Sequence, residues 1–205
     1  MENFWDMRFK QDAYVYGTLP NAFFKEAIDR YKPTGKLLLP AEGEGRNATY
    51  AAKTGLNVYA FDTSIEGKNK AMKLAERNNV SINYEVGDFF NLELLNETFD
   101  AAALIFAHFS LDILQDYHKK VVELLKPNGL IIIEAFSKNH IEFQKVNPLA
   151  GGPKNIDMLF SKETIARDFP NFEILKLDEM EDTLKEGEFH NGKAKLIRFI
   201  GRKTV

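Results

Sequence analysis

The sequence of 205 residues contains no cysteine. This absence excludes disulfide bonds, thiolate nucleophiles, and zinc or iron–sulfur sites with cysteine ligands. The four histidines are scattered and show no helical ligand pair, so we expect no metal site. The longest apolar run, 101–107, is far shorter than the roughly 18 residues that suggest a membrane span.

A strong charge of one sign is also lacking. The 27 lysine and arginine residues and 30 aspartate and glutamate residues give a formal net charge of −3, whereas nucleic-acid-binding proteins usually carry a basic surface. The first ten residues alternate charged and aromatic side chains, unlike a signal peptide. We therefore predict a soluble, cytoplasmic protein that binds a small molecule and neither nucleic acid nor membrane.

Short apolar runs alternate with amphipathic segments through the first two thirds of the chain. The predicted strands are 36–40, 57–62, 81–88, 99–109 and 130–136, and the predicted helices between them are 47–53, 68–78 and 110–126. This alternation is typical of a parallel sheet with crossover helices.

The last third of the chain follows another pattern. A predicted helix over 161–169 precedes two strand-like runs, 172–178 and 194–201, with no helix between them, and strands joined in this way pair antiparallel. We predict a single α/β domain with a Rossmann-like, mostly parallel seven-stranded sheet, one antiparallel edge strand near the C-terminus, and helices on both faces. Residues 1–34 would form a helical lid, 35–136 the cofactor-binding core, and 137–205 the substrate-side loops and final strands.

A glycine-rich turn follows the first predicted strand. Gly43 and Gly45 would let the backbone approach a ligand closely, and the next helix would offer free N–H groups. Asp62, at the end of the second predicted strand, is placed to accept hydrogen bonds from a ribose diol. Asp88, after the third, could hold an adenine amino group, with Phe89 against the ring.

Two cofactors fit this layout. The glycine spacing over 43–48 matches the dinucleotide fingerprint, with Asp62 as the ribose acid. S-adenosylmethionine uses the same ribose acid but brings no pyrophosphate. The carboxylates of Glu42 and Glu44 favour S-adenosylmethionine, because they would repel a pyrophosphate and tolerate a sulfonium with its amino group.

Several motifs together resemble one known family. They lie at 5–9 (WDMRF), 16–23 (YGTLPNAF), 41–47 (AEGEGRN), 62, 88 and 125–129 (LKPNG). Over essentially its whole length the chain resembles a class I S-adenosylmethionine-dependent methyltransferase, and within that class the tellurite-resistance/thiopurine methyltransferase-like family. Leu39 and Ala41 stand where that family usually has an aspartate and its first loop glycine, and Glu42 could supply the lost carboxylate.

The layout and the resemblance together give the candidate site residues. The predicted cofactor-binding residues are Trp5, Tyr16, Gly17, Glu42, Gly43, Gly45, Arg46, Asn47, Asp62, Thr63, Asp88, Phe89 and Phe106. The predicted substrate-binding residues are Asn21, His108, Phe109 and His190. We expect 147–158 to be a flexible connector that closes over the acceptor, 179–193 to be a loop on the same face, and His118 and His140 to lie at the surface.

His108 is the candidate catalytic residue. It follows the fourth predicted strand, at the edge where open α/β sheets bind ligands, and could act as a general base. Methyl transfer from a sulfonium mainly requires alignment of the reacting atoms. Because no clear acid–base constellation is visible, the sequence favours a soft acceptor such as a thiol or chalcogenide. The alternatives are a non-catalytic S-adenosylmethionine-binding module and an NAD-dependent oxidoreductase, the latter disfavoured because 205 residues leave no room for a second catalytic domain.

Overall fold

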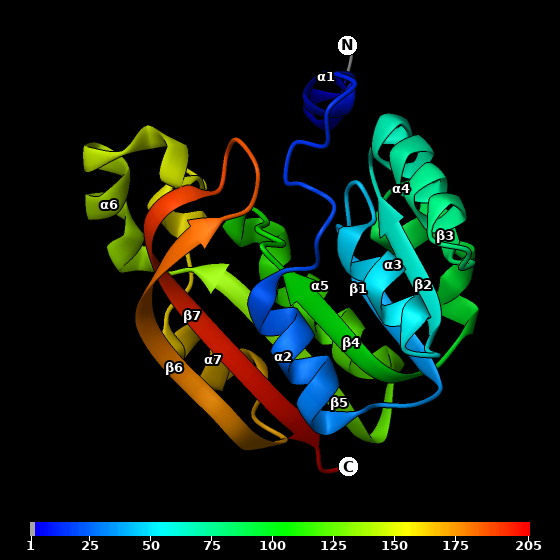
Figure 1. Ribbon diagram of the computed structural model, residues 1–205. Helices are drawn as coiled ribbons and strands as arrows, with labels where there is room; N and C mark the ends of the chain where they lie inside the picture. Colours follow the sequence, from blue (N-terminus) through cyan, green and yellow to red (C-terminus); the bar gives the residue numbers. More distant parts are fainter. Residues whose placement is uncertain (1–2) are drawn as a thin grey trace.

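Figure 1 shows the computed structural model, which describes residues 3–205; the first two residues of the predicted lid lie outside this range. Within it, seven strands form one sheet in the order β3-β2-β1-β4-β5-β7-β6. The strands are Lys36–Pro40 (β1), Asn57–Asp62 (β2), Asn83–Val86 (β3), Phe99–Ile105 (β4), Leu125–Phe136 (β5), Phe172–Lys185 (β6) and Asn191–Lys203 (β7).

The strand directions confirm the predicted Rossmann-like sheet. Neighbouring strands from β3 to β5 are parallel, and β7 is antiparallel to both β5 and β6. The predicted edge position of the antiparallel strand is wrong, because β7 lies between β5 and β6 and leaves β6 at the edge. The burial of residues 196–201 explains this, since an internal strand is covered on both faces.

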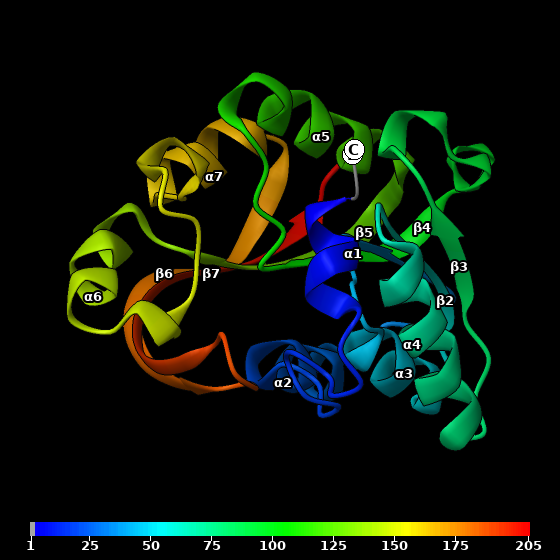
Figure 2. The same cartoon turned by 90° about the horizontal axis from the view of Figure 1, so that it is seen from above.

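Helices cover both faces of the sheet, as predicted. The helices are Phe4–Phe9 (α1), Ala22–Tyr31 (α2), Arg46–Lys53 (α3), Ile65–Arg77 (α4), Leu111–Leu124 (α5), Ile141–Val146 (α6) and Lys162–Asp168 (α7). Figure 2 shows α2, α3 and α4 on one side of the sheet and α5 and α7 on the other. Short 3-10 helices cover Phe89–Asn91, Glu93–Asn96, Lys138–His140, Pro148–Ala150 and Ile156–Met158.

Strand β1 shows how one apolar run provides core residues for both faces of the sheet. Successive side chains of a strand point to opposite sides. Leu37 and Leu39 accordingly pack with α2, α3 and α4, whereas Leu38 packs with α5 and α7. A short run of leucines therefore contributes to the hydrophobic cores on both faces of the sheet, between the sheet and each of the two helical layers.

Several element boundaries differ from the prediction. Strand β4 ends at Ile105 because Phe106 adopts a left-handed backbone with φ of 54°, which turns the chain out of the sheet. Helix α5 ends at Leu124, and residues 125–129 already belong to β5. The predicted loop 179–193 is mostly strand, since β6 and β7 extend into it and leave only residues 186–190 as a turn.

The predicted surface positions of His118 and His140 are wrong, because both side chains are buried, with 0% exposure. The Nδ1 atom of His118 lies 2.8 Å from the carboxylate of Asp168, a partner that only the packing of α5 on α7 provides. His140 stacks on Phe136, with ring centroids 4.4 Å apart. Among residues 3–205, every helix is too short or too polar to cross a lipid bilayer.

Candidate active site

A cavity of about 560 Å³ opens at the carboxyl ends of β1, β2 and β4. Small-molecule sites commonly have volumes of roughly 300–1,000 Å³, so it can hold a ligand of cofactor size. Its walls come from the lid (residues 3–21), the glycine turn (41–45), the strand ends, the connector (147–158) and the β6–β7 turn (186–190).

Most of the predicted site residues meet in this cavity. Those that line it are Trp5, Tyr16, Gly17, Glu42, Gly43, Arg46, Asn47, Asp62, Thr63, Phe106, His108, Phe109 and His190. The connector contributes Gly152, Pro153, Lys154 and Met158 to the wall. Residues that are distant in the sequence are thus brought together at one edge of the sheet.

Four predicted site residues do not line the cavity: Asn21, Gly45, Asp88 and Phe89. Asn21 caps α2, and its side chain donates to Glu134 and Glu186 instead. Gly45 begins α3, where an added Cβ would lie 2.5 Å from the Cβ of Ala71. Asp88 is exposed and caps a 3-10 helix, and Phe89 is buried in the core against Phe61 and Tyr117.

The glycine turn needs left-handed backbone at three positions. Gly43 and Gly45 have φ of 62° and 82°, and Ala41 has φ of 51°. Such a conformation is strained for a residue with a Cβ. The structure therefore gives a reason for glycine at position 41 and shows that alanine still supports the turn.

The carboxylate of Glu42 fills the N-terminus of α3. It accepts the backbone N–H of Ala48 at 2.7 Å and lies 3.5 Å from the side-chain amide of Asn47. Burial raises the pKa of Glu42 to about 7. Because the chain's own carboxyl group occupies the end of the helix, a pyrophosphate would find no free anion site there.

Asp62 joins the end of β2 to the glycine turn. Its carboxylate accepts the backbone N–H groups of Gly43 and Ser64, both at 3.0 Å. Burial raises its pKa to about 6. A carboxylate offers about four acceptor positions, and backbone N–H groups do not use all of them, so Asp62 keeps capacity for a hydroxyl group of a ligand in the cavity.

The lid is fixed onto the glycine turn by Glu44. This carboxylate accepts the backbone N–H of Val15 at 2.8 Å and pairs with Lys70 at 2.8 Å. The ring of Phe9 lies against Gly43, where an added Cβ would be 3.2 Å from it, and stacks on Trp5 with centroids 5.5 Å apart. Figure 1 shows α1 standing apart from the layers, above the strand ends.

Arg46 connects three walls of the cavity. Its guanidinium donates to the carbonyl of Tyr16 in the lid at 3.2 Å and to the carboxylate of Glu186 in the β6–β7 turn at 2.8 Å. Burial opposes ionisation of Glu186, but His190 and Arg46 beside it lower its pKa to about 2. This buried ion pair holds the lid, the turn and α3 in register.

The geometry of His108 argues against the general-base role that we predicted. Its Nδ1 lies 2.7 Å from the carbonyl of Met158, and its Nε2 accepts the backbone N–H of Phe136 at 3.2 Å. Burial lowers its pKa to about 4. Both ring nitrogens are therefore engaged with backbone, and the neutral ring ties the connector to the end of β5.

Other lining residues were not among the predicted site residues. They are Phe4, Arg8, Phe9, Ala41, Glu44, Phe61, Ile105, Ala107, Tyr117 and Phe136. Tyr117, for example, belongs to the apolar face of α5, so its spacing is that of a core residue. The density of aromatics before β1 was the one signal that could have found Phe4 and Phe9.

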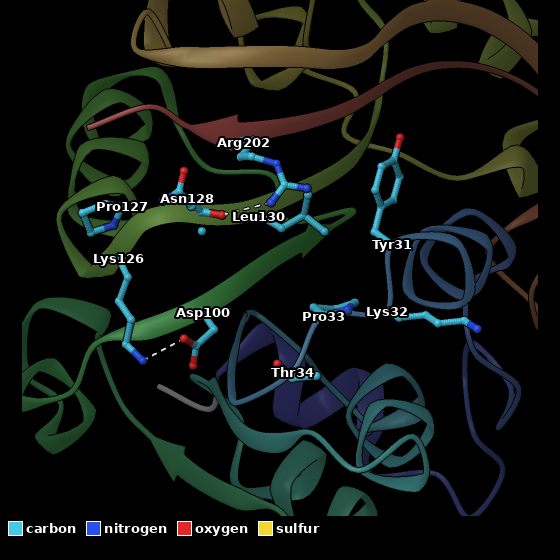
Figure 3. Close-up of a pocket in the computed structure, with 11 residues that line it drawn as sticks. Tyr31, Lys32, Pro33, Thr34, Asp100, Lys126, Pro127, Asn128, Leu130 and Arg202 are labelled. Atoms are coloured by element: carbon cyan, nitrogen blue, oxygen red, sulfur yellow. Dashed lines mark hydrogen bonds and ion pairs between the residues drawn. The ribbon is translucent and has the colours of Figure 1, made fainter.

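A second cavity, of about 310 Å³, lies at the amino-terminal ends of β1, β4 and β5 (Figure 3). Its polar groups satisfy one another, since Lys126 pairs with Asp100 at 2.7 Å and Arg202 donates to the carbonyl of Asn128 at 3.3 Å. Among the described residues, none of the buried side-chain atoms that lack a partner lies in this cavity. It therefore gives no sign of a ligand.

One known family matches the part of the chain that forms much of the first cavity. Residues 40–133, which include the glycine turn, Asp62 and the end of β4, match the family model described as a methyltransferase domain. This stretch of the chain is therefore similar to a methyltransferase domain. This match and the shared fold support the predicted S-adenosylmethionine-dependent methyltransferase and its cofactor, and they disfavour the NAD alternative.

Solved structures share the fold of this chain. One comes from work on the conversion of a disulfide bond into a thioacetal group during echinomycin biosynthesis; it has a TM-score of 0.75 and 17% identity, over 98% of this chain and 91% of that chain. TehB from Haemophilus influenzae has a TM-score of 0.71 and 17% sequence identity, over 98% of this chain and 66% of that chain. A third structure is the magnesium protoporphyrin IX methyltransferase (ChlM) from Synechocystis PCC 6803, solved with bound SAH. It has a TM-score of 0.68 and 13% sequence identity, over 98% of this chain and 93% of that chain.

Proposed function

We propose that the protein transfers a methyl group from S-adenosylmethionine to a small thiol or chalcogenide, in keeping with its resemblance to the tellurite-resistance/thiopurine methyltransferase-like family. One observation carries this proposal: a single cavity has carboxylates on one wall and aromatic rings on another. Asp62 and Glu42 lie on the first wall, and Phe106, Phe109 and Phe136 on the second.

The carboxylate wall fits the cofactor. Asp62 would accept hydrogen bonds from the ribose hydroxyls, with Thr63 beside it, because its carboxylate keeps unused acceptor positions. Arg46 and Asn47, at the start of α3, would face the amino-acid end of the cofactor. When bound, the cofactor supplies an electrophilic methyl group on a sulfonium. Asp88 and Phe89 have no part in this proposal because they do not line the cavity.

The lid completes the cofactor site. Trp5, Tyr16 and Gly17 line the cavity from above the glycine turn. Aromatic faces attract a cation, by roughly 2 kcal/mol when the pair is desolvated, which suits a sulfonium. Because Glu44 and Arg46 pin the lid to the core, its role is to hold the cofactor and exclude water.

The aromatic wall suits a soft acceptor. The rings of Phe106 and Phe136 lie 4.7 Å apart, and Met158 and Pro153 of the connector extend the apolar surface. Contacts of sulfur with aromatic rings contribute roughly 0.3–1.5 kcal/mol. A polarisable thiol or chalcogenide is therefore better matched to this wall than a strongly hydrated amine or alcohol.

Two measurements test the proposal. Calorimetric titration of the purified protein is expected to show micromolar binding of S-adenosylhomocysteine and S-adenosylmethionine and no binding of NAD. A screen of thiol, selenol, telluride, amine and hydroxyl acceptors, read by mass spectrometry, should then yield methylated product from the chalcogen acceptors. Product from only the amines or hydroxyls would overturn the acceptor class while leaving the methyltransferase assignment intact.

A further inference from the structure

A second histidine of the cavity lies in a different environment from His108. His190 is in the β6–β7 turn, has an exposed fraction of 6%, and lines the cavity beside the aromatic wall. Its ring centroid is 4.4 Å from that of Phe106 and 4.5 Å from that of Tyr16 in the lid. The imidazole is therefore held between the lid and the end of β4, where the cofactor and acceptor walls meet.

The two ring nitrogens of His190 have different surroundings. Nδ1 is fully buried, has no hydrogen-bond partner, and lies 3.6 Å from the carboxylate of Glu186. Nε2 makes no hydrogen bond among the described residues and is not one of the fully buried unpartnered atoms. Nε2 therefore keeps a free lone pair in a side chain that lines the cavity, in contrast to His108, whose nitrogens both bind backbone groups.

Glu186 is held in place by two donors. Arg46 donates to one of its oxygens at 2.8 Å, and the side-chain amide of Asn21 donates to the other at 2.9 Å. The turn is closed by the backbone N–H of Glu186 on the carbonyl of His190 at 2.9 Å. This network fixes a carboxylate behind the imidazole, an arrangement that orients a histidine for proton transfer.

We propose that Nε2 of His190 takes the proton from the nucleophilic atom of the acceptor, and that Glu186 is the positioning residue that keeps the other proton on Nδ1. This proposal rests on the function proposed above and narrows its acceptor to a protonated one, such as a neutral thiol. The acceptor sulfur forms a bond to the methyl carbon, and the bond from that carbon to the sulfonium sulfur breaks. Its electron pair stays on that sulfur as a neutral thioether, and the acceptor proton goes to His190.

The groups around His190 keep the imidazole neutral and ready to accept a proton. Burial lowers the pKa of His190, and the guanidinium of Arg46 and the ring of His140 lower it further. The carboxylate of Glu186 raises this pKa and so opposes the shift. Tyr16 packs on the ring from the lid, and burial raises the pKa of that phenol, so it adds no charge. His108 is also held neutral by burial.

The test compares two aromatic thiols with the intact enzyme. Phenylmethanethiol is protonated at neutral pH because ordinary thiols have a pKa of about 8.5, whereas 4-nitrothiophenol is already ionised. In His190→Gln, kcat/KM for phenylmethanethiol should fall by about 100-fold or more, the usual scale of general-base catalysis. The value for 4-nitrothiophenol should change by less than about threefold.

Two further variants sharpen this comparison. Glu186→Gln should lower the rate with phenylmethanethiol by a smaller factor and shift its pH profile, because the imidazole loses its orienting charge. His118→Gln is the matched control, since His118 is a buried histidine that pairs with Asp168 and does not line the cavity. It should leave the ratio of the two kcat/KM values unchanged. Equal losses with both thiols in His190→Gln, or no loss with either, would overturn the proposal.

A measurement without turnover separates this proposal from the acceptor class. In nitrogen-15 NMR of the protein bound to S-adenosylhomocysteine, His190 should be neutral at pH 7 with its proton on Nδ1. A proton on Nε2 would refute the base role whatever the acceptor. A wild-type enzyme that binds S-adenosylhomocysteine but methylates neither thiol would refute the thiol class, and the tautomer would still decide the role of His190.

Discussion

The carboxylate of Glu42 accepts the backbone N–H of Ala48 at 2.7 Å, so an acidic side chain of the glycine turn caps the helix that the same turn begins. This contact places a titratable group in the wall of the cavity for which we propose cofactor binding. It also gives the stability of the protein a specific dependence on pH.

Replacing Glu42 with glutamine should change that dependence. Burial raises the pKa of Glu42 from 4.5 to about 7 in the folded state, so the stability contributed by the neutral carboxyl is present below pH 4.5 and is lost as the pH rises through 7. Relative to Glu42→Gln, the wild type should lose up to about 3 kcal/mol of unfolding free energy between pH 4 and pH 8. Urea unfolding of both proteins across this pH range measures the difference. If the unfolding free energies of the two proteins changed in parallel with pH, the raised pKa of Glu42 would be excluded.

Asp62→Asn should weaken cofactor binding. The variant removes charge-assisted hydrogen bonds to the ribose and weakens the contacts with Gly43 and Ser64, so the dissociation constant for S-adenosylhomocysteine should rise by at least about tenfold, or ~1.5 kcal/mol. Calorimetry provides the measurement. The matched control is Asp88→Asn, which changes an exposed aspartate outside the cavity. A comparable loss in the control would restore the adenine-binding role that the sequence suggested for Asp88.

Glu44→Gln should loosen the lid. The substitution removes the charge that holds the backbone N–H of Val15 and pairs with Lys70, a change of about 1.5–3 kcal/mol for a buried hydrogen-bonded charge. Amide hydrogen exchange of residues 13–17 should accelerate markedly in the variant, while exchange in the central strands stays slow. Unchanged protection of the lid would show that Glu44 does not anchor it.

Ala41→Gly should stabilise the protein. Alanine at φ of 51° carries a strain of roughly 1–2 kcal/mol that glycine does not, and the greater freedom of glycine in the unfolded chain offsets about 0.4–1 kcal/mol of this. The expected gain in unfolding free energy is therefore about 0.5–1 kcal/mol by urea denaturation. A loss of stability would mean that the methyl group's packing outweighs the strain.

The cofactor half of the site was largely predictable from the sequence. Gly43 lies in the turn that follows β1, Asp62 is the last residue of β2, and the carboxyl ends of neighbouring parallel strands meet at one edge of the sheet. Glu42 and Arg46 lie in the same local turn. Their positions depend on chain neighbours and on a sheet order that the alternation of strands and helices already implied.

The acceptor half was not predictable in the same way. His108 and His190 were both candidates from their places after or between strands, but no local pattern tells which of the two rings keeps a free nitrogen. The carbonyl of Met158 and the N–H of Phe136 decide this for His108, and the connector and β5 bring them there. Asp88 shows the limit of such predictions, because a residue after a strand can turn outward to cap the next element, as this exposed aspartate does.

The sequence by itself determined the elements, their parallel pairing up to β5, and the glycine turn, because apolar periodicity and turn chemistry act over a few neighbouring residues. Only the tertiary structure decided that β7 lies inside the sheet and that Arg46 meets Glu186, its ion-pair partner 140 residues further along the chain. Such pairs form where packed layers bring distant segments to the same buried place. No local sequence pattern predicts such a contact between distant residues.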